Sequence, residues 1–435
     1  MASGRKVQES EEKVMEQSTI AIVILVMTML LVMNDRIPLA VTSMLAALAM
    51  SLTGIQPLGK AYAYFGNTTI VFCGATMIIC NGLFETGAIQ KVSDLLFRKM
   101  AQKSERALVA AISLFTGLIT GFTTNSAIAA TMVPVARSIA MESHGKVKAK
   151  NLLMPVGMMS TIGSPLSLSG AAAVSMAGAM VNEAGGNLGF FSMAPITLIL
   201  LAVSTLYFAT AGYWIMKKSF DLEDPVVELP AVNMKQVPRW KPILNLVVFF
   251  LMIAGFISGI WNVAIVSLLC VAVLCLTHCI SMNAAIRSCD WNVLIVMAGV
   301  TSMANGLDAS GAGKVIAHAF LQLMGGSEAS LPMMMVAMGL VGWFLSQFMS
   351  NTAANAIVIP IALSLGMAMN INVLYFCVPV IIGTAIAITT PLASPTTVIV
   401  MQGGFRFKDF VKVGIPLSII LLLIMFLLSP LFFPA

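Results

Sequence analysis

Charged residues are scarce in this chain. Only 10% of its 435 residues are Asp, Glu, Lys or Arg, whereas 59% are hydrophobic. The interior of a soluble domain is too small for so much apolar side-chain surface, so the composition excludes an ordinary soluble fold. Long runs with almost no charge follow one another along the chain, and this pattern predicts an all-α polytopic membrane protein.

Patterns of catalytic and cofactor-binding residues are missing as well. The seven cysteines lie mostly inside apolar runs, and their spacing fits neither a zinc site nor haem attachment. The sequence contains no Ser–His–acid set, no metal-ligand cluster and no dinucleotide-binding motif. We therefore do not expect an enzyme. The net charge of +6 is explained by cytoplasmic loops, so no nucleic-acid partner is expected.

Ten apolar runs are predicted to cross a lipid bilayer. They cover residues 19–33, 38–54, 68–84, 152–181, 194–216, 243–260, 262–280, 291–307, 373–400 and 411–433. Residues 1–16 are polar and lack the basic start and the cleavage site of a signal peptide. We therefore expect a polar N-terminal tail that is followed by a retained first span.

Two short polar stretches interrupt apolar runs in nearly the same way. Residues 122–134 read FTTNSAIAATMVP, and residues 348–360 read FMSNTAANAIVIP. The residues at their centres are Thr124, Asn125 and Ser126 (the first triplet) and Ser350, Asn351 and Thr352 (the second triplet). Because lipid cannot solvate amide and hydroxyl groups, a paired polar turn at membrane depth is typical of a binding site or cavity. The duplication therefore indicates transport.

The segments around the triplets, 107–141 and 331–367, are predicted to be re-entrant hairpins. The first has roughly 16 residues before its triplet and roughly 15 after it, so that each arm reaches only about 22–24 Å. That length is shorter than a hydrocarbon core of about 30 Å. Residues 89–106 mix basic and apolar positions and predict an amphipathic interfacial helix, and 313–325 is a less charged counterpart.

The two halves of the chain repeat each other. The pairs that are 226 residues apart include Asn125 and Asn351, Pro134 and Pro360, and Pro165 and Pro391. Each copy contains five spans and one hairpin. Because five is odd, the second copy enters the membrane upside down, and such inverted repeats are typical of secondary transporters. We expect the first repeat at 17–217, a cytoplasmic linker at 218–242 and the second repeat at 243–435.

The positive charges predict the orientation of the spans. With the N-terminus outside and ten spans, most of the 24 Lys and Arg residues lie inside, as the positive-inside rule requires. Those left outside are Arg5, Lys6, Lys13, Lys60 and Lys314. We therefore predict a multi-pass protein of the inner (plasma) membrane with both termini outside. The first hairpin then opens from the cytoplasm and the second from the outside.

The triplets offer the chemistry that an ion and an anion need. Neutral amide and hydroxyl oxygens suit a partly dehydrated Na⁺, whereas amide donors and helix N-termini suit a carboxylate or another oxyanion. Thr120 and Ser346 lie five residues before the two Asn residues and are expected to reach an ion held there. Pro165 and Pro391, each among hydroxyl residues and 40 positions after its Asn, predict broken helices with free carbonyls.

Ionisable side chains are absent from the centres of the predicted spans. No Lys, Arg or His lies there, and Glu85 and Asp308 lie near span ends. Proton-coupled carriers usually place a carboxylate or a His at membrane depth. The sequence therefore favours Na⁺ coupling, or exchange, over a proton relay.

The chain resembles the divalent anion:sodium symporter family, which includes the INDY-like dicarboxylate and sulfate carriers. The resemblance covers essentially the whole chain. It rests on the two triplets with their following prolines, on Ala393–Thr396, and on the closing stretch 403–416. It implies Na⁺-coupled symport of a small dianion, with a dicarboxylate favoured over sulfate. It also implies a homodimer in which a transport domain moves as an elevator against a scaffold. An exchanger or another antiporter of the same superfamily is the nearest alternative, and a channel is less favoured.

The same resemblance implies roles for individual residues. The implied substrate contacts are Thr124, Asn125, Ser126, Ser350, Asn351, Thr352, Ser394, Pro395 and Thr396. The implied Na⁺ ligands are Thr120, Asn125, Ser164 and Ser167 in one half and Ser346, Asn351, Thr390 and Ala393 in the other. The first triplet reads Thr-Asn-Ser where the family reads Ser-Asn-Thr, and Leu166 and Ser167 follow Pro165 where a Pro-Asn type pair is common. We therefore expect the first half to set substrate specificity.

Overall fold

The computed structural model describes residues 2–32, 37–89, 104–143, 146–220, 238, 240–323, 330–390, 394–401 and 403–435. All regular elements in these ranges are helices, as the composition predicts. The interfacial helix predicted at 89–106 falls almost entirely outside the described residues, as do Pro391 and Ala393.

The first half of the chain forms two groups of helices around a hairpin. Its elements are α1 (Ala2–Val32), α2 (Leu39–Leu52), α3 (Leu58–Ala63), η1 (Tyr64–Gly66), α4 (Thr68–Glu85), α6 (Glu105–Thr120), α7 (Asn125–Glu142), α8 (Ala149–Ile162), η2 (Ser164–Leu166), α9 (Ala172–Glu183), α10 (Ala194–Ala209) and α11 (Ala211–Ser219). Helices α6 and α7 contact each other, and both pack on α8.

The second half follows the same order of elements. They are α12 (Trp240–Ser258), α13 (Val263–Leu276), α14 (Met282–Ser288), α15 (Trp291–Ala309), α16 (Ala312–Leu323), α17 (Leu331–Ser346), α18 (Asn351–Ala368), α19 (Leu374–Ala385), α20 (Pro395–Met401) and α21 (Phe407–Phe432). Helices α17 and α18 contact each other and pack on α19, as α6 and α7 pack on α8.

The ten predicted spans all coincide with helices, but not all of them are single straight helices. Five helical stretches are long and apolar enough to cross a membrane. Four of them, Met15–Val32, Leu58–Glu85, Trp240–Ser258 and Phe407–Phe432, overlap predicted spans, and the fifth, Asn351–Ala368, lies in the segment predicted to be the second hairpin. Two bent pairs, α10 with α11 (46°) and α15 with α16 (84°), raise the number to seven in the described part of the chain. The sharp bend at the start of α16 agrees with the interfacial piece expected at 313–325.

Both predicted broken helices are interrupted where the sequence places proline. Helix α8 ends at Ile162, and the backbone then passes through the short η2 turn around Pro165 before α9 begins at Ala172. Helix α19 ends at Ala385, and α20 begins only at Pro395. Proline disfavours a continuous helix because it lacks an N–H group and clashes with the preceding turn. Helix α8 nevertheless runs through Pro155 and α19 through Pro379, so proline alone does not end either helix.

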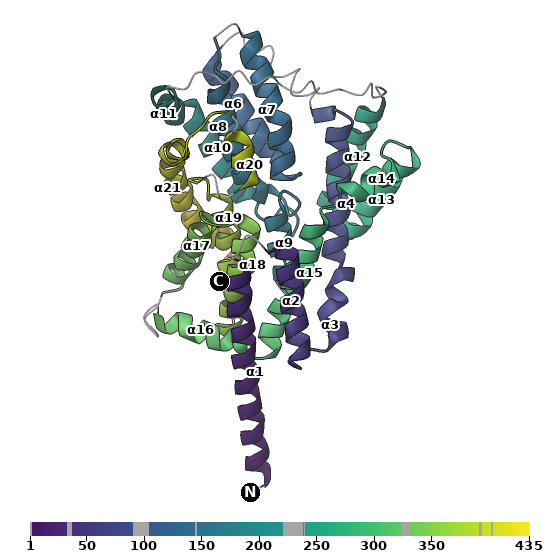
Figure 1. Cartoon of the computed structure of the whole chain (residues 1–435), viewed down its shortest axis with the longest axis vertical. Helices are drawn as coiled ribbons and strands as arrows, with labels where there is room; N and C mark the ends of the chain where they lie inside the picture. Colours follow the sequence, from purple (N-terminus) through teal and green to yellow (C-terminus); the bar gives the residue numbers. More distant parts are fainter. Residues whose placement is uncertain are drawn as a thin grey trace.

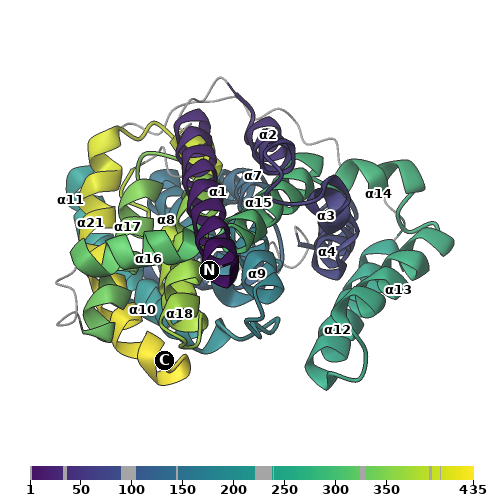
Figure 2. The same cartoon turned by 90° about the horizontal axis from the view of Figure 1, so that it is seen from below.

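The helices are arranged so that the two hairpins lie toward opposite ends of the molecule. Figure 1 shows α6 and α7 in the upper part and α16, α17 and the lower part of α18 below. Helices α12, α13 and α14 form an arm at one side, seen in both Figure 1 and Figure 2, that contacts the rest mainly through α4. Helix α18 also packs on α9, and α20 packs on α7 and α8, so the two halves interlock.

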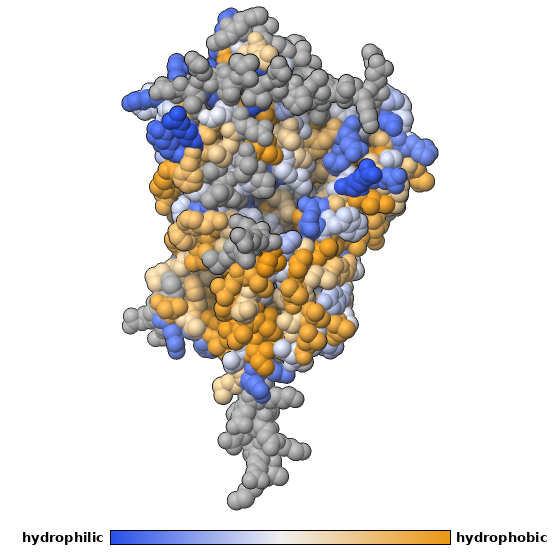
Figure 3. All heavy atoms as spheres, in the orientation of Figure 1, coloured by the Kyte–Doolittle hydropathy of each residue, from blue (hydrophilic) through white to orange (hydrophobic). Residues whose placement is uncertain are grey.

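Much of the outer surface is apolar. Side chains such as Ile260, Leu276 and Leu431 are at least 75% exposed. Figure 3 shows apolar residues over the lower half of one face, polar residues toward its upper right, and a hollow between them. Exposed apolar surface of this extent is stable in contact with lipid rather than water.

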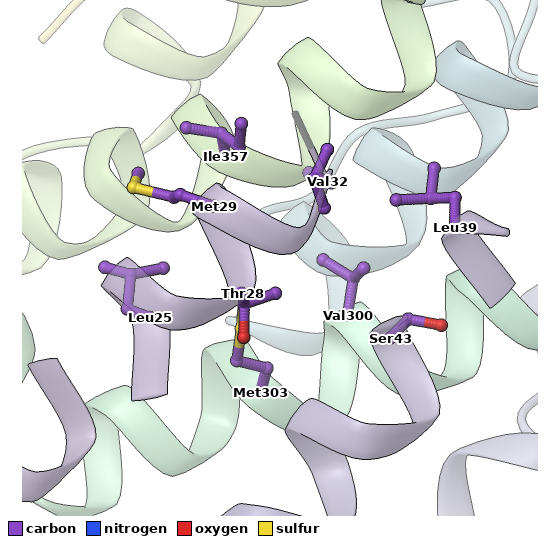
Figure 4. A pocket seen from close by; sticks show the side chains of 10 residues that line it. Leu25, Thr28, Met29, Val32, Leu39, Ser43, Val300, Met303 and Ile357 are labelled. Carbon is purple, nitrogen blue, oxygen red and sulfur yellow. The ribbon is translucent and has the colours of Figure 1, made fainter. Parts of the chain in front are cut away.

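An apolar pocket between α1, α2, α15 and α18 is a packing defect rather than a site. Leu25, Met29, Val300 and Met303 are among the side chains around it (Figure 4). Its volume is about 10 Å³, close to the smallest space that holds one water molecule. The pocket is therefore too small and too apolar to bind a polar ligand.

Candidate functional site

The two triplets meet in one cavity. It has a volume of about 500 Å³ and is lined by all six triplet residues together with Ser394. The first triplet comes from the turn between α6 and α7, and the second comes from the turn between α17 and α18. Residues more than 220 positions apart in the sequence therefore face the same space.

Each triplet lies at the start of a long helix. Asn125 and Asn351 are the first residues of α7 and α18, and the residues before them, Thr124 and Ser350, have extended backbones. The first turn of a helix has unpaired N–H groups and a partial positive charge, which together attract anions. Both helices therefore place their positive N-terminal ends at the cavity, which favours the binding of a negatively charged ligand.

The two triplets differ in how they cap their helices. The Ser350 hydroxyl accepts a hydrogen bond from the Ala353 N–H at 3.2 Å. The Thr124 side chain makes no such cap bond to α7. At the first helix the Ala127 N–H donates instead to the Thr124 carbonyl oxygen at 3.1 Å. The equivalent N–H group is thus paired with a side chain in the second helix and with backbone in the first, a difference that coincides with the Thr-Asn-Ser order in the sequence.

In the second half, the expected ion ligands lie close together. The Ser346 hydroxyl donates to Asn351 Oδ1 at 2.6 Å and lies 3.4 Å from the Thr384 carbonyl oxygen. Next to it, the Thr390 hydroxyl donates to the Gln347 carbonyl oxygen at 2.6 Å. Hydroxyl, amide and carbonyl oxygens are thus gathered beside the second triplet, which is the donor set that hard cations prefer.

In the first half, the corresponding groups are paired differently. The Thr120 hydroxyl donates to the Thr116 carbonyl oxygen of its own helix at 2.6 Å, whereas the Ser346 hydroxyl donates to its Asn. With its amide oriented to face acceptors, Asn125 donates to the carbonyl oxygens of Ser160 and Gly170, at 3.2 Å each. The first triplet is therefore fastened to both sides of the α8–α9 break.

The hydroxyl groups of the first broken helix also pair with backbone. Ser167 donates to the Gly121 carbonyl oxygen at 2.5 Å, and Ser164 donates to Thr161 at 2.7 Å. Gly121, the partner of Ser167, directly follows Thr120. In the second half, Thr390 bonds in the same way to Gln347, which directly follows Ser346. Each hairpin is thus held on its broken helix by a hydroxyl near the break.

The last expected substrate residues lie at the beginning of α20. Ser394 lines the cavity, and its hydroxyl is 2.6 Å from that of Thr396. Thr396 is fully buried and lies behind the cavity wall. Pro395 begins α20, and Ala393 is outside the described residues.

The structure adds residues to the cavity that the sequence interpretation missed. Arg287 and Asp290, together with Ser288, Cys289 and Val293, form part of its wall. The sequence interpretation assigned Arg287 to an inside loop and gave it no role. The only local signal was a capping pattern, because the Asp290 carboxylate accepts from the Val293 N–H at 3.3 Å at the start of α15.

A buried asparagine joins the second hairpin to both broken helices. Asn355 is fully buried in α18, donates to the Ala173 carbonyl oxygen at 3.1 Å, and accepts from the Thr384 hydroxyl at 3.1 Å. Ala173 lines the cavity. The position 226 residues earlier is Ala129, so this bridge exists only in the second half.

Replacing Asn355 with alanine is expected to lower stability. The Ala173 carbonyl would lose one hydrogen bond, and the Thr384 hydroxyl would keep only its bond to the Ile381 carbonyl oxygen at 2.9 Å. Each lost hydrogen bond is expected to cost about 0.5–1.5 kcal/mol. Thermal unfolding of the detergent-purified protein would measure this loss, with the exposed Asn187→Ala variant as control. Equal melting temperatures for the two variants would contradict the bridging role.

Comparisons with known proteins agree with this architecture. A family model described as "Citrate transporter" matches residues 23–333 and 314–435. An uncharacterized transporter of Haemophilus influenzae is 25% identical over 406 residues, which are 89% of this chain and 86% of that protein. The sodium-dependent dicarboxylate transporter SdcS of Staphylococcus saprophyticus is 21% identical over 441 residues, which are 91% of this chain and 83% of that protein.

A solved structure shows the same fold. The YdaH transporter of Alcanivorax borkumensis superposes with a TM-score of 0.62 at 15% identity, covering 89% of this chain and 88% of that chain. The prediction of an all-α polytopic membrane protein is thereby confirmed, and so is the resemblance to the divalent anion:sodium symporters. The prediction that the protein is a transporter rather than an enzyme is also confirmed. The chain belongs to the citrate transporter family of secondary membrane transporters.

Proposed function

We propose that this protein couples Na⁺ movement to the uptake of a small dianion, with a dicarboxylate favoured over sulfate. The observation that carries the proposal is the convergence of both triplets and two helix N-termini on one cavity of about 500 Å³. That volume lies in the range of small-molecule sites, about 300–1,000 Å³. The relative SdcS, whose name states sodium dependence and a dicarboxylate substrate, supports both parts of the proposal.

The Na⁺ ions would bind beside the triplets. In the second half, Ser346 and Asn351 already place two oxygens within 2.6 Å of each other, and Thr390 lies at the adjacent turn. In the first half, Ser164, Ser167 and Asn125 surround the break of the α8–α9 segment. An ion in each place would add positive charge next to the anion without a buried lysine or arginine, which favours joint binding of Na⁺ and substrate.

The two halves of the chain would allow the cavity to open to each side of the membrane in turn. We propose two inverted repeats, 17–217 and 243–435, joined by a cytoplasmic linker at 218–242, with an elevator movement that exposes the cavity alternately to each side. The opposed positions of the hairpins in Figure 1 support this arrangement. The proposal includes a homodimer in the inner (plasma) membrane with both termini outside, an orientation that rests on the distribution of Lys and Arg.

Uptake into proteoliposomes tests the proposed function directly. Purified protein would be given labelled succinate, citrate, sulfate or aspartate, each with and without an inward Na⁺ gradient. We expect the rate of succinate uptake to rise with the Na⁺ concentration. The dependence should be sigmoidal, because more than one Na⁺ ion moves in each transport cycle. Uptake that does not depend on Na⁺ but requires dicarboxylate inside the vesicle would instead show that the protein is an exchanger.

A further inference from the structure

Arg287 is the cationic side chain in the wall of the triplet cavity. It lies in the last turn of α14, and the cavity that it lines also contains both triplets. The arginine comes from the α12–α14 arm, whereas the triplets come from the two hairpins. Among the described residues, its guanidinium forms no ion pair. A positive charge with no partner therefore borders a cavity that we propose to bind an anion.

The helix that carries Arg287 is held firmly in place. Asn81 of α4 donates to the Ser288 hydroxyl at 2.7 Å, and Ser288 donates to the Ala284 carbonyl oxygen at 2.7 Å. The Ser281 hydroxyl caps the other end of α14 by accepting from the Ala284 N–H at 3.2 Å. The backbone position of Arg287 is thus set by a short capped helix tied to α4, so only the arginine side chain has to become ordered when an anion binds.

The acidic side chain in the same wall is already engaged. The Asp290 carboxylate caps α15 through the Val293 N–H, and the positive end of that helix offsets part of its charge. Asp290 forms no ion pair with Arg287 among the described residues. The planar guanidinium remains free for two parallel hydrogen bonds to a carboxylate of the substrate.

We propose that Arg287 binds the substrate carboxylate that lies away from the triplets. This inference rests on the proposed function and narrows its substrate class to anions that carry separated carboxylates. One carboxylate is held at the hairpin tips by the triplets, and the second reaches the α14 wall of the cavity. A compact anion such as sulfate occupies the tips alone and gains nothing from Arg287. The arginine thus accounts for a preference for dicarboxylates or tricarboxylates.

Kinetics of Arg287→Gln test this role. In proteoliposomes with saturating Na⁺, we expect the KM for succinate to rise about 10-fold or more, the factor that corresponds to about 1.4 kcal/mol. The maximal rate and the half-activating Na⁺ concentration should change little. The inhibition constant of sulfate should stay within about 3-fold of its wild-type value, a smaller change than the 10-fold rise expected in the KM for succinate. The KM of Arg287→Lys should lie between those of the wild type and Arg287→Gln, because lysine keeps the positive charge but cannot form the two parallel hydrogen bonds of a guanidinium. The exposed Lys408→Gln variant removes one positive charge outside the cavity and serves as control.

Cys289 provides a readout that does not depend on transport. Its side chain also lines the cavity, so we expect a charged thiol reagent to label it and succinate to protect it, with Cys289→Ser as the labelling control. In Arg287→Gln, protection should require about 10-fold more succinate, matching the shift in KM.

The outcomes separate the two proposals. An unchanged KM in Arg287→Gln, or an equal loss for succinate and sulfate, would overturn the role of Arg287 while leaving Na⁺-coupled transport intact. A wild-type protein that takes up none of these anions would instead overturn the proposed function.

Discussion

Replacing Asn351 with alanine is expected to reduce Na⁺-dependent uptake to background while the protein still folds. Asn351 lines the cavity as the first residue of α18, and its Oδ1 accepts from Ser346 at 2.6 Å. Alanine removes the amide that we propose to contact both the substrate and one Na⁺. Both functions are lost with one side chain, so neither a higher Na⁺ nor a higher substrate concentration should restore transport.

The folding cost of this substitution should be modest, because the buried Ser346 hydroxyl loses one hydrogen bond but keeps the Thr384 carbonyl oxygen at 3.4 Å as an acceptor. The Asn351 side chain is only partly buried, and alanine favours a helix more than asparagine does. The comparison is with Asn187→Ala, which removes the same side chain from an exposed loop. Uptake in proteoliposomes and melting temperature in detergent would be measured for both variants. Wild-type transport in Asn351→Ala would show that the site is assigned to the wrong place.

Local sequence signals were enough to locate the helices and the triplets. Pro165 and Pro391 lie among clustered hydroxyl residues, which distinguishes them from Pro155 and Pro379 inside the continuous helices α8 and α19. The triplets stand out because amide and hydroxyl groups are costly anywhere in an apolar run. These signals depend on neighbouring residues alone, so the hairpins and broken helices could be predicted without knowing how the helices pack.

Features that depend on packing between distant segments were not predictable. Arg287 enters the cavity because α14 is tied to α4 by the bond between Asn81 and Ser288, 207 positions apart. Likewise, the repeat suggested that Thr120 and Ser346 behave alike. Ser346 bonds to Asn351, whereas Thr120 bonds to its own helix. A one-dimensional repeat fixes which residues correspond but not how each half is packed.

A single methyl group at Gly163 is expected to separate the first hairpin from its broken helix. Gly163 directly follows the last residue of α8, and a Cβ added there would lie 2.0 Å from the Gly117 carbonyl oxygen on α6. No side-chain rotation relieves this overlap, because the obstructing atoms belong to the backbone. Helices α6 and α8 would have to move apart, which we expect to cost about 1–3 kcal/mol or more.

This movement would also disrupt the site. Asn125 bonds at 3.2 Å to carbonyl oxygens on both sides of the break, and hydrogen bonds weaken steeply when they lengthen by a few tenths of an ångström beyond that. The first triplet would therefore lose its fixed position relative to the second, and binding depends on both. We expect Gly163→Ala to retain less than about a tenth of wild-type uptake, since a 1.4 kcal/mol loss alone gives that factor.

The matched comparison is Gly59→Ala, because a Cβ at Gly59 in α3 meets no atom within 4 Å. Alanine at that helical position should leave stability equal or slightly higher. Uptake and thermal unfolding of the two variants would be compared in the same vesicles and detergent. If Gly163→Ala is as stable and active as Gly59→Ala, the contact between α6 and α8 tolerates added volume. The positions of the triplets would then have to be maintained by other contacts, such as the bond from Ser167 to the Gly121 carbonyl oxygen.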